Sequence, residues 1–322
     1  MTSILAAHYR AACYLDVESF KPGNVSVVAP GHGMCAADFM RSADHSAAAL
    51  TLVDDPLGRR IYAAVAATRA AVGCNTNLGI VLLVAPMVQA TFGFASMPLR
   101  TGLTRVLDAT TPADAAAVYA AIRLASPGGL GRAGRQDVAD EPDVTLVEAM
   151  RLAAERDLIA RQYANGFDEL CNVAVPYLDD AQARFDDSAL AMTDLYLYLL
   201  ARFPDSHVAR KHGVACAASV RDRAGDIHAD FLAASDELAR LGVLHQYDAE
   251  LKQRGINPGT TADLCVAACF FHRLQQQAET HAGSAPDHAR TAKQKLTSVR
   301  IVRLAKQSKE NLNGSHYQDP RG

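Results

Sequence analysis

Hydrophobic side chains recur along much of the chain at intervals of three and four residues, the spacing of one face of an α-helix. Ile61, Val65, Thr68 and Val72 form one such face, and residues 190–203 form an apolar run long enough for a buried helix. Residues 25–29 are the one β-branched run of note, and flanking turn residues favour a short extended loop there. The pattern predicts an all-α protein.

Turn and cap residues divide these helices. Thr111 followed by Pro112 predicts a helix start, and Asp205 or Ser206 is the expected cap of a later one. The last core helix is expected over residues 263–279. Asp157 falls on the apolar face of a predicted helix, which suggests a buried and paired carboxylate.

The domain organisation follows from where this pattern stops. Residues 1–280 are predicted to form one all-helical catalytic domain with functional loops at helix ends. Residues 281–322 are a polar, basic tail that we expect to be partly mobile.

Composition narrows the class of protein. The 32 basic and 35 acidic residues give a formal charge of −3, and Trp is absent, so we expect no nucleic-acid partner. The most apolar run, residues 79–87, is too short to span a bilayer, so no membrane partner is expected. Seven cysteines without a Cys-x-x-Cys pair favour a reducing compartment, and we predict a cytoplasmic location.

The polar residues that could carry chemistry lie in loops between apolar helices. The first group is Glu18, Lys21, Gly23 and Asn24, followed by His32 and Asp38; a solvated turn is the alternative. The second is Asn75, Thr76 and Asn77, where helix capping is the alternative. A Gly-rich stretch, residues 127–131, could bind an anion through its backbone N–H groups, or be a flexible turn.

Two further loops carry cations and hydroxyls. Ser206 and Arg210 share one helical face, and His207 and Lys211 share another. This cationic stripe suits phosphate binding, although a solvated face explains it equally well. Asn257, Gly259 and Thr260 precede Asp263 at a helix start, where they could hold a phosphate or a metal-bound water, or simply cap the helix.

Taken in order, these loops resemble a known family. The motifs are Glu-x-x-Lys-Pro-Gly-Asn-Val, Gly-His with a following Asp-Phe, Asn-Thr-Asn-Leu-Gly, Asp-Ser-His-x-x-Arg-Lys-x-Gly and Asn-Pro-Gly-Thr-Thr-Ala-Asp-Leu. From about Ala7 to Arg273 the chain resembles the triphosphoribosyl-dephospho-CoA synthases. The resemblance implies an all-α fold and transfer of the 5-triphosphoribosyl group of ATP to the 2′-hydroxyl of 3′-dephospho-CoA, with release of adenine.

The sequence also departs from that family's pattern. His32 and Asp38 are more widely spaced than in the family, and Asn77-Leu78-Gly79 stands where His-Lys-Gly is usual, which removes a phosphate ligand. Asn257-Pro258-Gly259-Thr260 replaces Ser-Pro-Gly-Gly. These departures resemble a branch found beside one-carbon metabolism genes. They imply an alternative, a Mg²⁺-dependent ribosyl or nucleotide transferase or hydrolase in one-carbon (tetrahydromethanopterin-type) cofactor biosynthesis. A non-catalytic helical scaffold is a third alternative.

The resemblance and the residue chemistry together suggest roles. Displacement of adenine through an oxocarbenium-like state needs a base and cations on the triphosphate. We predict Glu18 and Asp38 as base and Mg²⁺ ligand in either order, with Asp263 the next metal ligand. The predicted catalytic residues are thus Glu18, Asp38 and Lys21, and the predicted nucleotide- or phosphate-binding residues are Gly23, Asn24, His32, Asn75, Thr76, Asn77, Ser206, Arg210, Lys211, Asn257, Gly259 and Thr260.

These hypotheses share one geometric requirement. Glu18, Asn75, Arg210 and Asn257, which are far apart in sequence, must meet in one cavity that binds ATP and a CoA-like or other ribosyl-containing molecule. A homodimer through an Ala-rich helix face is a further expectation.

Overall fold

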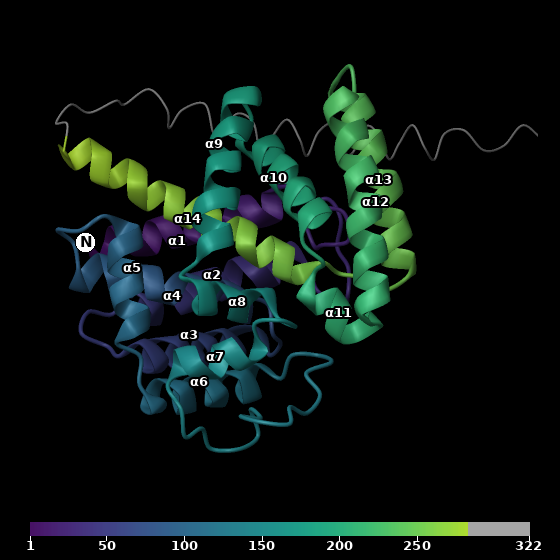
Figure 1. Cartoon of the computed structure of the whole chain (residues 1–322). Coiled ribbons are helices and arrows are strands. Elements are labelled where there is room, and N and C mark those ends of the chain that lie inside the picture. Colours follow the sequence, from purple (N-terminus) through teal and green to yellow (C-terminus); the bar gives the residue numbers. More distant parts are fainter. Residues whose placement is uncertain (283–322) are drawn as a thin grey trace, which may run out of the picture.

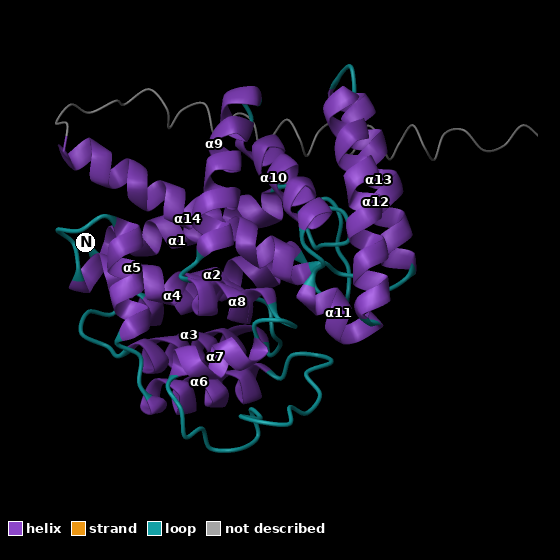
Figure 2. Cartoon of the chain, in the orientation of Figure 1, coloured by secondary structure: helices purple, strands orange, loops and turns teal. Residues whose placement is uncertain are grey.

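The computed structural model describes residues 1–282, and within that range the chain forms fourteen α-helices, one π-helical turn and no strand (Figure 2). The predicted all-α class is confirmed. Residues 25–34 form a loop with two isolated bridges in place of a strand. The helices are α1 Thr2–Glu18, α2 Ala36–Leu50, α3 Leu57–Val72, α4 Leu78–Gly93, α5 Leu99–Asp108, α6 Pro112–Ala125, α7 Leu146–Ala153, α8 Leu158–Asn165, π-helical η1 Leu170–Ala174, α9 Val175–Arg184, α10 Ser188–Arg202, α11 Ser206–His212, α12 Val214–Ala233, α13 Glu237–Gln253 and α14 Gly259–Ala282.

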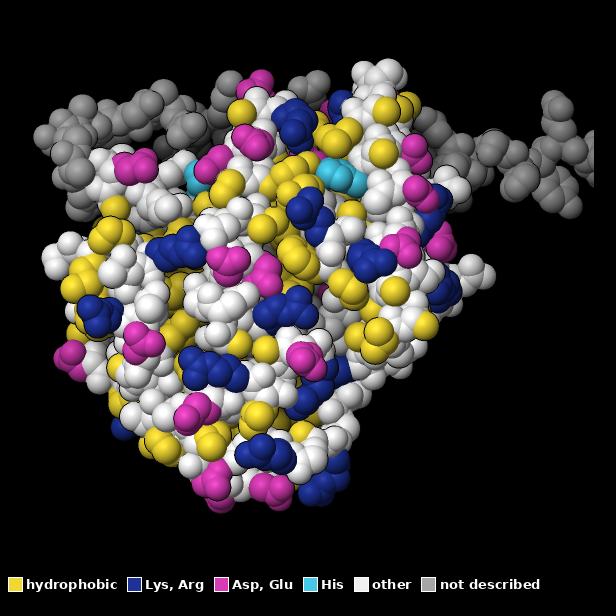
Figure 3. Space-filling view, viewed as in Figure 1, with side chains coloured by type: hydrophobic (Ala, Val, Ile, Leu, Met, Phe, Trp, Pro, Cys, Tyr) yellow, Lys and Arg dark blue, Asp and Glu magenta, His cyan; other side chains and the backbone are white. Residues whose placement is uncertain are grey.

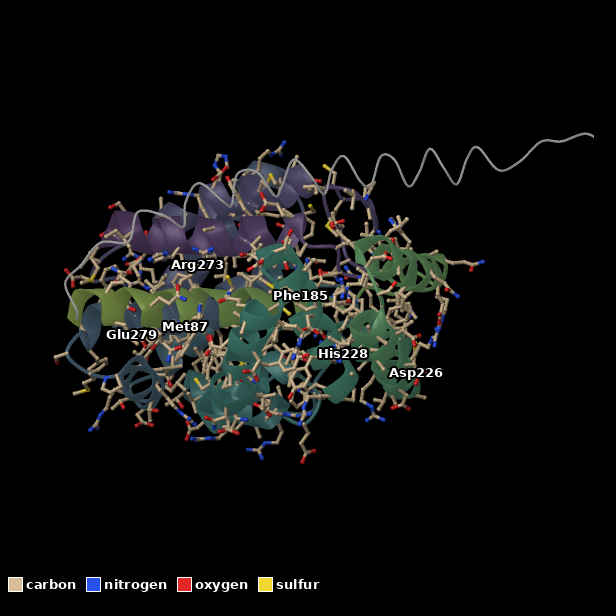
Figure 4. The ribbon with its side chains drawn as sticks, turned by 90° about the horizontal axis from the view of Figure 1, so that it is seen from above. Met87, Phe185, Asp226, His228, Arg273 and Glu279 are labelled. Atoms are coloured by element: carbon tan, nitrogen blue, oxygen red, sulfur yellow. The ribbon has the colours of Figure 1, made fainter. Side chains whose placement is uncertain are left out.

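Two helices form the centre of the molecule. α14 contacts α1, α4, α8, α9, α10 and α11. Figures 1 and 4 show it running beside α1 from one edge of the molecule to its centre. α4 is apolar on every side and almost wholly buried, as a helix without a polar face must be. The buried apolar side chains form one cluster from Leu5 to Leu274.

The remaining helices cover this centre on two sides. α2, α3 and α6 pack in succession on one side, and the α12–α13 pair packs against α10 on the other (Figure 1). Because α11 and the starts of α4, α8 and α14 lie between these two layers, several helix ends meet at one place.

Local sequence signals explain several boundaries. Thr111 caps α6 in a capping box with Asp114, and Pro112 opens that helix, as predicted. Of the two predicted caps of α11, Asp205 is the one that binds the Val208 N–H, at 3.0 Å. The apolar run 190–203 is indeed a buried helix, α10.

Other boundaries differ from the sequence prediction. α14 begins at Gly259, earlier than expected, because the Gly259–Thr261 segment is already helical. The placement of Asp157 on a helix face was wrong: α7 ends at Ala153, and Asp157 caps α8 by accepting the N–H groups of Ile159 and Ala160, both at 3.0 Å. A carboxylate satisfies free N–H groups at a helix start better than it tolerates an apolar face.

Across residues 1–282 no helix has both the length and the apolar character to cross a membrane. The predicted tail lies outside the described residues, except that residues 281 and 282 end α14. The division of the chain at residue 280 therefore stays a prediction.

Candidate active site

A cavity of about 620 Å³ lies where the helix ends meet. Its walls come from the loop after α1, the starts of α4, α8 and α14, helix α11, and the long loop between α6 and α7. This convergence brings together ten of the predicted site residues, which are Asn24, Asn75, Thr76, Asn77, Ser206, Arg210, Asn257, Gly259, Thr260 and Asp263.

The two carboxylates predicted as base and metal ligand do not line this cavity. Glu18 is half-buried at the end of α1, where burial and then the neighbouring Asp187 raise its pKa. Asp38 closes a capping box at the start of α2, and the hydrogen bonds from the Cys35 N–H, at 3.0 Å, and thiol lower its pKa. Four residues were predicted to lie in one cavity. Asn75, Arg210 and Asn257 do so, and Glu18 does not.

Gly23 and His32 do not line the cavity, but their hydrogen bonds hold the loop between α1 and α2 in place. The Gly23 N–H donates to Asp248 at 2.8 Å, and its carbonyl accepts from the His32 ring at 2.8 Å. Gly23 has a φ of +81°, and an added Cβ would lie 2.9 Å from both Leu251 and Pro258, so only glycine fits. The loop is thereby tied to the end of α13, beside the cavity.

Lys211 and Lys21 also stand outside the lining, but for different reasons. Lys211 lies against the Gly-rich loop, where its Cε would be 2.8 Å from a Cβ on Gly128. Lys21 is 0% exposed and forms an ion pair with Asp16 at 3.1 Å.

Asp16 is a cavity carboxylate that the sequence motifs did not single out. It is 4% exposed; burial raises its pKa, and Lys21 opposes that shift. A signal was present, since Asp16 continues the buried face of α1 formed by Tyr9, Ala12 and Cys13, at the i, i+3, i+4, i+7 positions. An acid on such a face needs a partner, which Lys21 supplies.

Asp263 reaches the start of α4 because residue 79 is glycine. A Cβ on Gly79 would lie 2.0 Å from Asp263 Oδ2. The pKa of Asp263 is raised well above its usual range, first by burial and then by Asp16, Asp205 and Asp157, while Arg210 opposes the shift. The cavity therefore holds a carboxyl group that favours a proton or a bound cation.

Most of the predicted polar residues hold the walls in place. The Asn24 amide donates to Asn257 Oδ1 at 2.6 Å, which joins the loop after α1 to the segment before α14. Ser206 Oγ accepts the Leu158 N–H at 2.7 Å, which joins α11 to α8. Asp205 accepts both the N–H and the hydroxyl of Thr261 at 2.8 Å, which joins α11 to α14.

The Asn-Thr-Asn segment is fixed in the same way. Asn75 Oδ1 accepts the Leu78 N–H at 3.2 Å, although the N-cap residue of α4 is Asn77 and not Asn75 or Thr76, the two caps proposed from the sequence. Thr76 hydrogen-bonds Ser42 at 2.5 Å, and the Asn77 amide lies 3.2 Å from Ser46 Oγ. Because these hydrogen bonds already occupy side-chain donors and acceptors, fewer of them are available to bind a ligand.

Several buried polar atoms around the cavity lack a hydrogen bond. Within the described residues these include Arg210 Nε, His207 Nε2 and Gln136 Oε1, as well as Asp16 Oδ1, which faces Lys21 without an aligned hydrogen bond. Buried polar atoms in folded proteins are nearly always paired, so such a concentration at one cavity points to a missing ligand. Sequence analysis placed His207 with Lys211 in a cationic stripe without giving it a role of its own, and it passed over Gln136.

The charges around the cavity are mixed. Arg210 is held by Asp157 at 2.9 Å, and the loop between α6 and α7 adds Arg132 and Arg135. Figure 3 shows basic and acidic side chains interspersed on one face, without a large patch of one sign. No three His, Cys, Asp or Glu side chains within residues 1–282 are placed to hold a metal ion on their own.

Comparison with known proteins identifies the family. The sequence model of the family described as CitG, ATP:dephospho-CoA triphosphoribosyl transferase, matches residues 2–281. The chain belongs to this family of enzymes. The resemblance carried by the loop motifs is confirmed, and those loops converge on one cavity.

Individual members of the CitG family match a shorter part of the chain than the family model does. Proteins from Streptococcus equi subsp. zooepidemicus (strain MGCS10565) and subsp. equi (strain 4047), each named a probable 2-(5''-triphosphoribosyl)-3'-dephosphocoenzyme-A synthase, are 28% and 27% identical over 114 residues. The alignments cover 35% of this chain and 37% of each relative.

A solved structure shares the fold. A candidate triphosphoribosyl-dephospho-CoA synthase from Archaeoglobus fulgidus superposes with a TM-score of 0.55 at 24% identity. The superposition covers 72% of this chain and 96% of that chain. At this identity the likeness concerns the CitG-family fold alone.

Proposed function

We propose that this protein transfers the 5-triphosphoribosyl group of ATP to the ribose 2′-hydroxyl of 3′-dephospho-CoA and releases adenine. The observation that carries the proposal is that the family's loops converge on one cavity. Several buried polar atoms of this cavity make no hydrogen bond within the described residues. A nucleotide offers the phosphate and hydroxyl groups that such atoms would bind.

Asp16 is the proposed base. As the bond between C1′ and adenine N9 breaks, adenine leaves with the bonding electrons and takes a proton from water. The acceptor oxygen forms its bond to C1′, and its proton passes to the Asp16 carboxylate. The ion pair with Lys21 at 3.1 Å holds this carboxylate in one orientation and favours its ionised form. We prefer Asp16 to the sequence-predicted Glu18 and Asp38 because it alone of the three lines the cavity.

Arg210 is the proposed phosphate ligand. Asp157 fixes one end of its guanidinium at 2.9 Å, while Nε has no partner and remains available. A guanidinium can bind a phosphate through two parallel hydrogen bonds. Arg135, which is exposed at the cavity and makes no ion pair within the described residues, would add a second cation.

The donor set fits Mg²⁺. Mg²⁺ usually takes one or two carboxylates and completes its shell with substrate phosphates and water. Asp263, whose pKa is raised by burial and by neighbouring carboxylates, is the proposed protein ligand, with Asp16 close enough to add to that shift. A bound Mg²⁺ would supply charge neutralisation on the triphosphate.

A different ribosyl-containing acceptor in one-carbon cofactor biosynthesis is the second candidate, together with membership of a divergent branch. It is favoured by Leu78, an apolar residue that lines the cavity at the start of α4 where the family pattern has a lysine. An acceptor with less negative charge would suit that wall.

Adenine release tests the proposal. Purified protein is incubated with ATP and Mg²⁺, with and without dephospho-CoA, and adenine is followed by chromatography. Release that requires dephospho-CoA supports the proposed reaction. Release only with another ribosyl compound supports the second candidate, and no release with any acceptor contradicts both.

Two matched substitutions on α1 test the base. Asp16→Asn should lower turnover by about 10²- to 10⁴-fold, the usual contribution of general acid–base catalysis. Glu18→Gln, two residues away, should retain turnover within a few fold. The reverse ranking would restore Glu18 as the base. Circular dichroism checks that both variants keep their helix content.

We also propose a cytoplasmic location and a homodimer. All seven cysteines are free thiols, which suits a reducing compartment. Val214 on the Ala-rich α12 and Leu238 on α13 expose apolar side chains that a second copy could cover. Sedimentation at micromolar concentration would detect the dimer.

A further inference from the structure

A histidine without an assigned role lies in the cavity wall. His207 is in the first turn of α11, between the cap Asp205 and Arg210. Its Nδ1 side faces the start of α14, where a Cβ on Gly259 would be 3.2 Å away. Its Nε2 atom is buried and has no hydrogen-bond partner among residues 1–282. One edge of the ring is therefore packed, and the other is left with an unused polar atom.

The groups around this ring are mostly basic. Arg210, Lys211 and His212 come from its own helix, and His32 comes from the loop between α1 and α2. The neighbouring carboxylates are already engaged, since Asp205 accepts from Val208 and Thr261, and Asp157 pairs with Arg210. At the start of α14, the neutral Gly259 and Asn257 lie next to the ring.

This setting keeps the free imidazole neutral. Burial first, and then the surrounding cations, lower the pKa of His207 to about 4. A bound polyanion would raise the pKa of His207 again, because its negative charge would outweigh the positive charge of the nearby cations.

We infer that His207 binds the triphosphate of ATP through Nε2 and takes up a proton from solution as the phosphate arrives. This inference rests on the proposed function, because it assumes that a triphosphate enters the cavity. The proton comes from the buffer, and the product is a charge-assisted hydrogen bond from Nε2–H to a phosphate oxygen. Free enzyme and complex then differ by up to one bound proton.

A phosphate explains this arrangement better than a nucleobase would. A neutral base could use Nε2 but would leave Arg210 Nε without an anionic partner, whereas a phosphate serves both atoms. The neutral state of the free ring also limits repulsion within the cationic group before the ligand binds.

Calorimetry measures the proton directly. ATP, and separately inorganic tripolyphosphate, is titrated into the full-length protein at pH 7 in two buffers that differ in ionisation enthalpy. The wild type should take up a substantial fraction of one proton per ligand, seen as a buffer-dependent heat. His45→Asn, an exposed histidine on α2, is the matched control and should leave the uptake unchanged.

Two variants of His207 separate the hydrogen bond from the proton. His207→Gln places an amide N–H near the position of Nε2, so it should bind ATP within a few fold of wild type but without proton uptake. His207→Asn cannot reach that position and should bind about 10- to 100-fold more weakly, the usual effect of losing a hydrogen bond to a charged group.

The outcomes distinguish this inference from the proposed function. Proton uptake that persists in His207→Gln, or a wild type that binds either ligand without uptake, overturns the role of His207 while the transferase proposal stands. Uptake with tripolyphosphate in a protein that releases no adenine supports His207 and contradicts the transferase proposal. Failure to bind either ligand contradicts both.

Discussion

The polar groups of the cavity and those of a second buried cluster differ in whether their hydrogen-bond partners are present. The second cluster, which we call the Asp194 cluster, consists of Tyr177, Arg184, Asp194 and His228 from α9, α10 and α12. Asp194 is 0% exposed, yet it accepts from His228 at 2.7 Å, from Tyr177 at 3.1 Å and from Arg184. Figure 4 labels His228 on α12. In the cavity, by contrast, Arg210 Nε and His207 Nε2 are buried without a hydrogen bond from the described part of the chain.

This difference distinguishes a buried polar group that stabilises the fold from one that is available to bind a ligand. A buried carboxylate with every partner in place stabilises contacts among helices, and its surroundings leave nothing for a ligand to satisfy. Tyr177 also stacks on Tyr198 with ring centres 3.6 Å apart, which closes the Asp194 cluster further. Burial alone would have ranked Asp194 above Asp263 as a site residue, whereas the cavity is lined by Asp263 and not by Asp194.

The largest predicted effect is on activity, from Asp263→Asn. We expect turnover to fall at least about a hundredfold, because the proposed Mg²⁺ ligand and its charge are lost. The fold should become more stable at pH 7. The folded-state pKa of Asp263 is raised, so the wild type loses stability as pH rises above the unfolded value near 4.

Asparagine lacks that pH dependence, so the stability advantage should vanish below about pH 4. Urea denaturation at pH 7 and pH 3.5 measures it. A variant that is less stable at pH 7 and still active would place Asp263 with Asp194 among the structural carboxylates.

The second prediction reverses the first. Asp194→Asn should cost on the order of 3 kcal/mol of unfolding free energy, because Arg184 and His228 lose their shared partner. Turnover per folded molecule should stay near wild type. Asp226→Asn is the control, since that exposed carboxylate on α12 pairs only loosely with Arg223, at 3.7 Å, and should change stability by less than about 0.5 kcal/mol. Loss of activity at wild-type stability in Asp194→Asn would contradict the comparison.

The third prediction concerns the glycine that admits Asp263. Gly79→Ala would put a methyl group 2.0 Å from Asp263 Oδ2, so the carboxylate must move. We expect a loss of about 1–3 kcal/mol in stability together with reduced turnover.

Gly242→Ala, in α13, provides the matched control because nothing lies within 4 Å of its Cβ. It should raise stability by about 0.4–1 kcal/mol without affecting turnover. Thermal melts and adenine release measure both variants, and an active, stable Gly79→Ala would show that Asp263 need not approach α4.

The smallest effect is predicted for Asp38→Ala. It removes half of the capping box of α2 and should cost about 1 kcal/mol at neutral pH. The pKa of Asp38 is lowered in the folded state, so this contribution exists above the unfolded value near 4 and is lost as pH falls further. Melts at pH 7 and pH 3 should therefore differ from wild type only at the higher pH. A large loss of turnover would instead support Asp38 as base or metal ligand.

Much of the fold was predictable because its signals are local. Helix faces, the cap at Thr111 and the start of α11 depend on residues within about four positions, where helix contacts form. The family motifs were equally visible, since each is a short loop read in order along the chain.

The choice of carboxylate was not visible in this way. Asp16 and Glu18 lie two positions apart on α1, which turns them about 200° from each other around the helix axis. One therefore faces the cavity while the other faces Asp187. The short motif that named Glu18 carried no information about which side α14 and α4 would cover.

The sequence by itself determined the helical class, the caps at Thr111 and Asp205 and the family, because these depend on spacing and on short motifs. Only the tertiary structure decided that Lys21 pairs with Asp16, that Gly79 admits Asp263, and that His207 keeps an unused nitrogen. The physical reason is that hydrogen-bond satisfaction and pKa depend on groups brought together from distant segments, and packing of the whole bundle sets those distances.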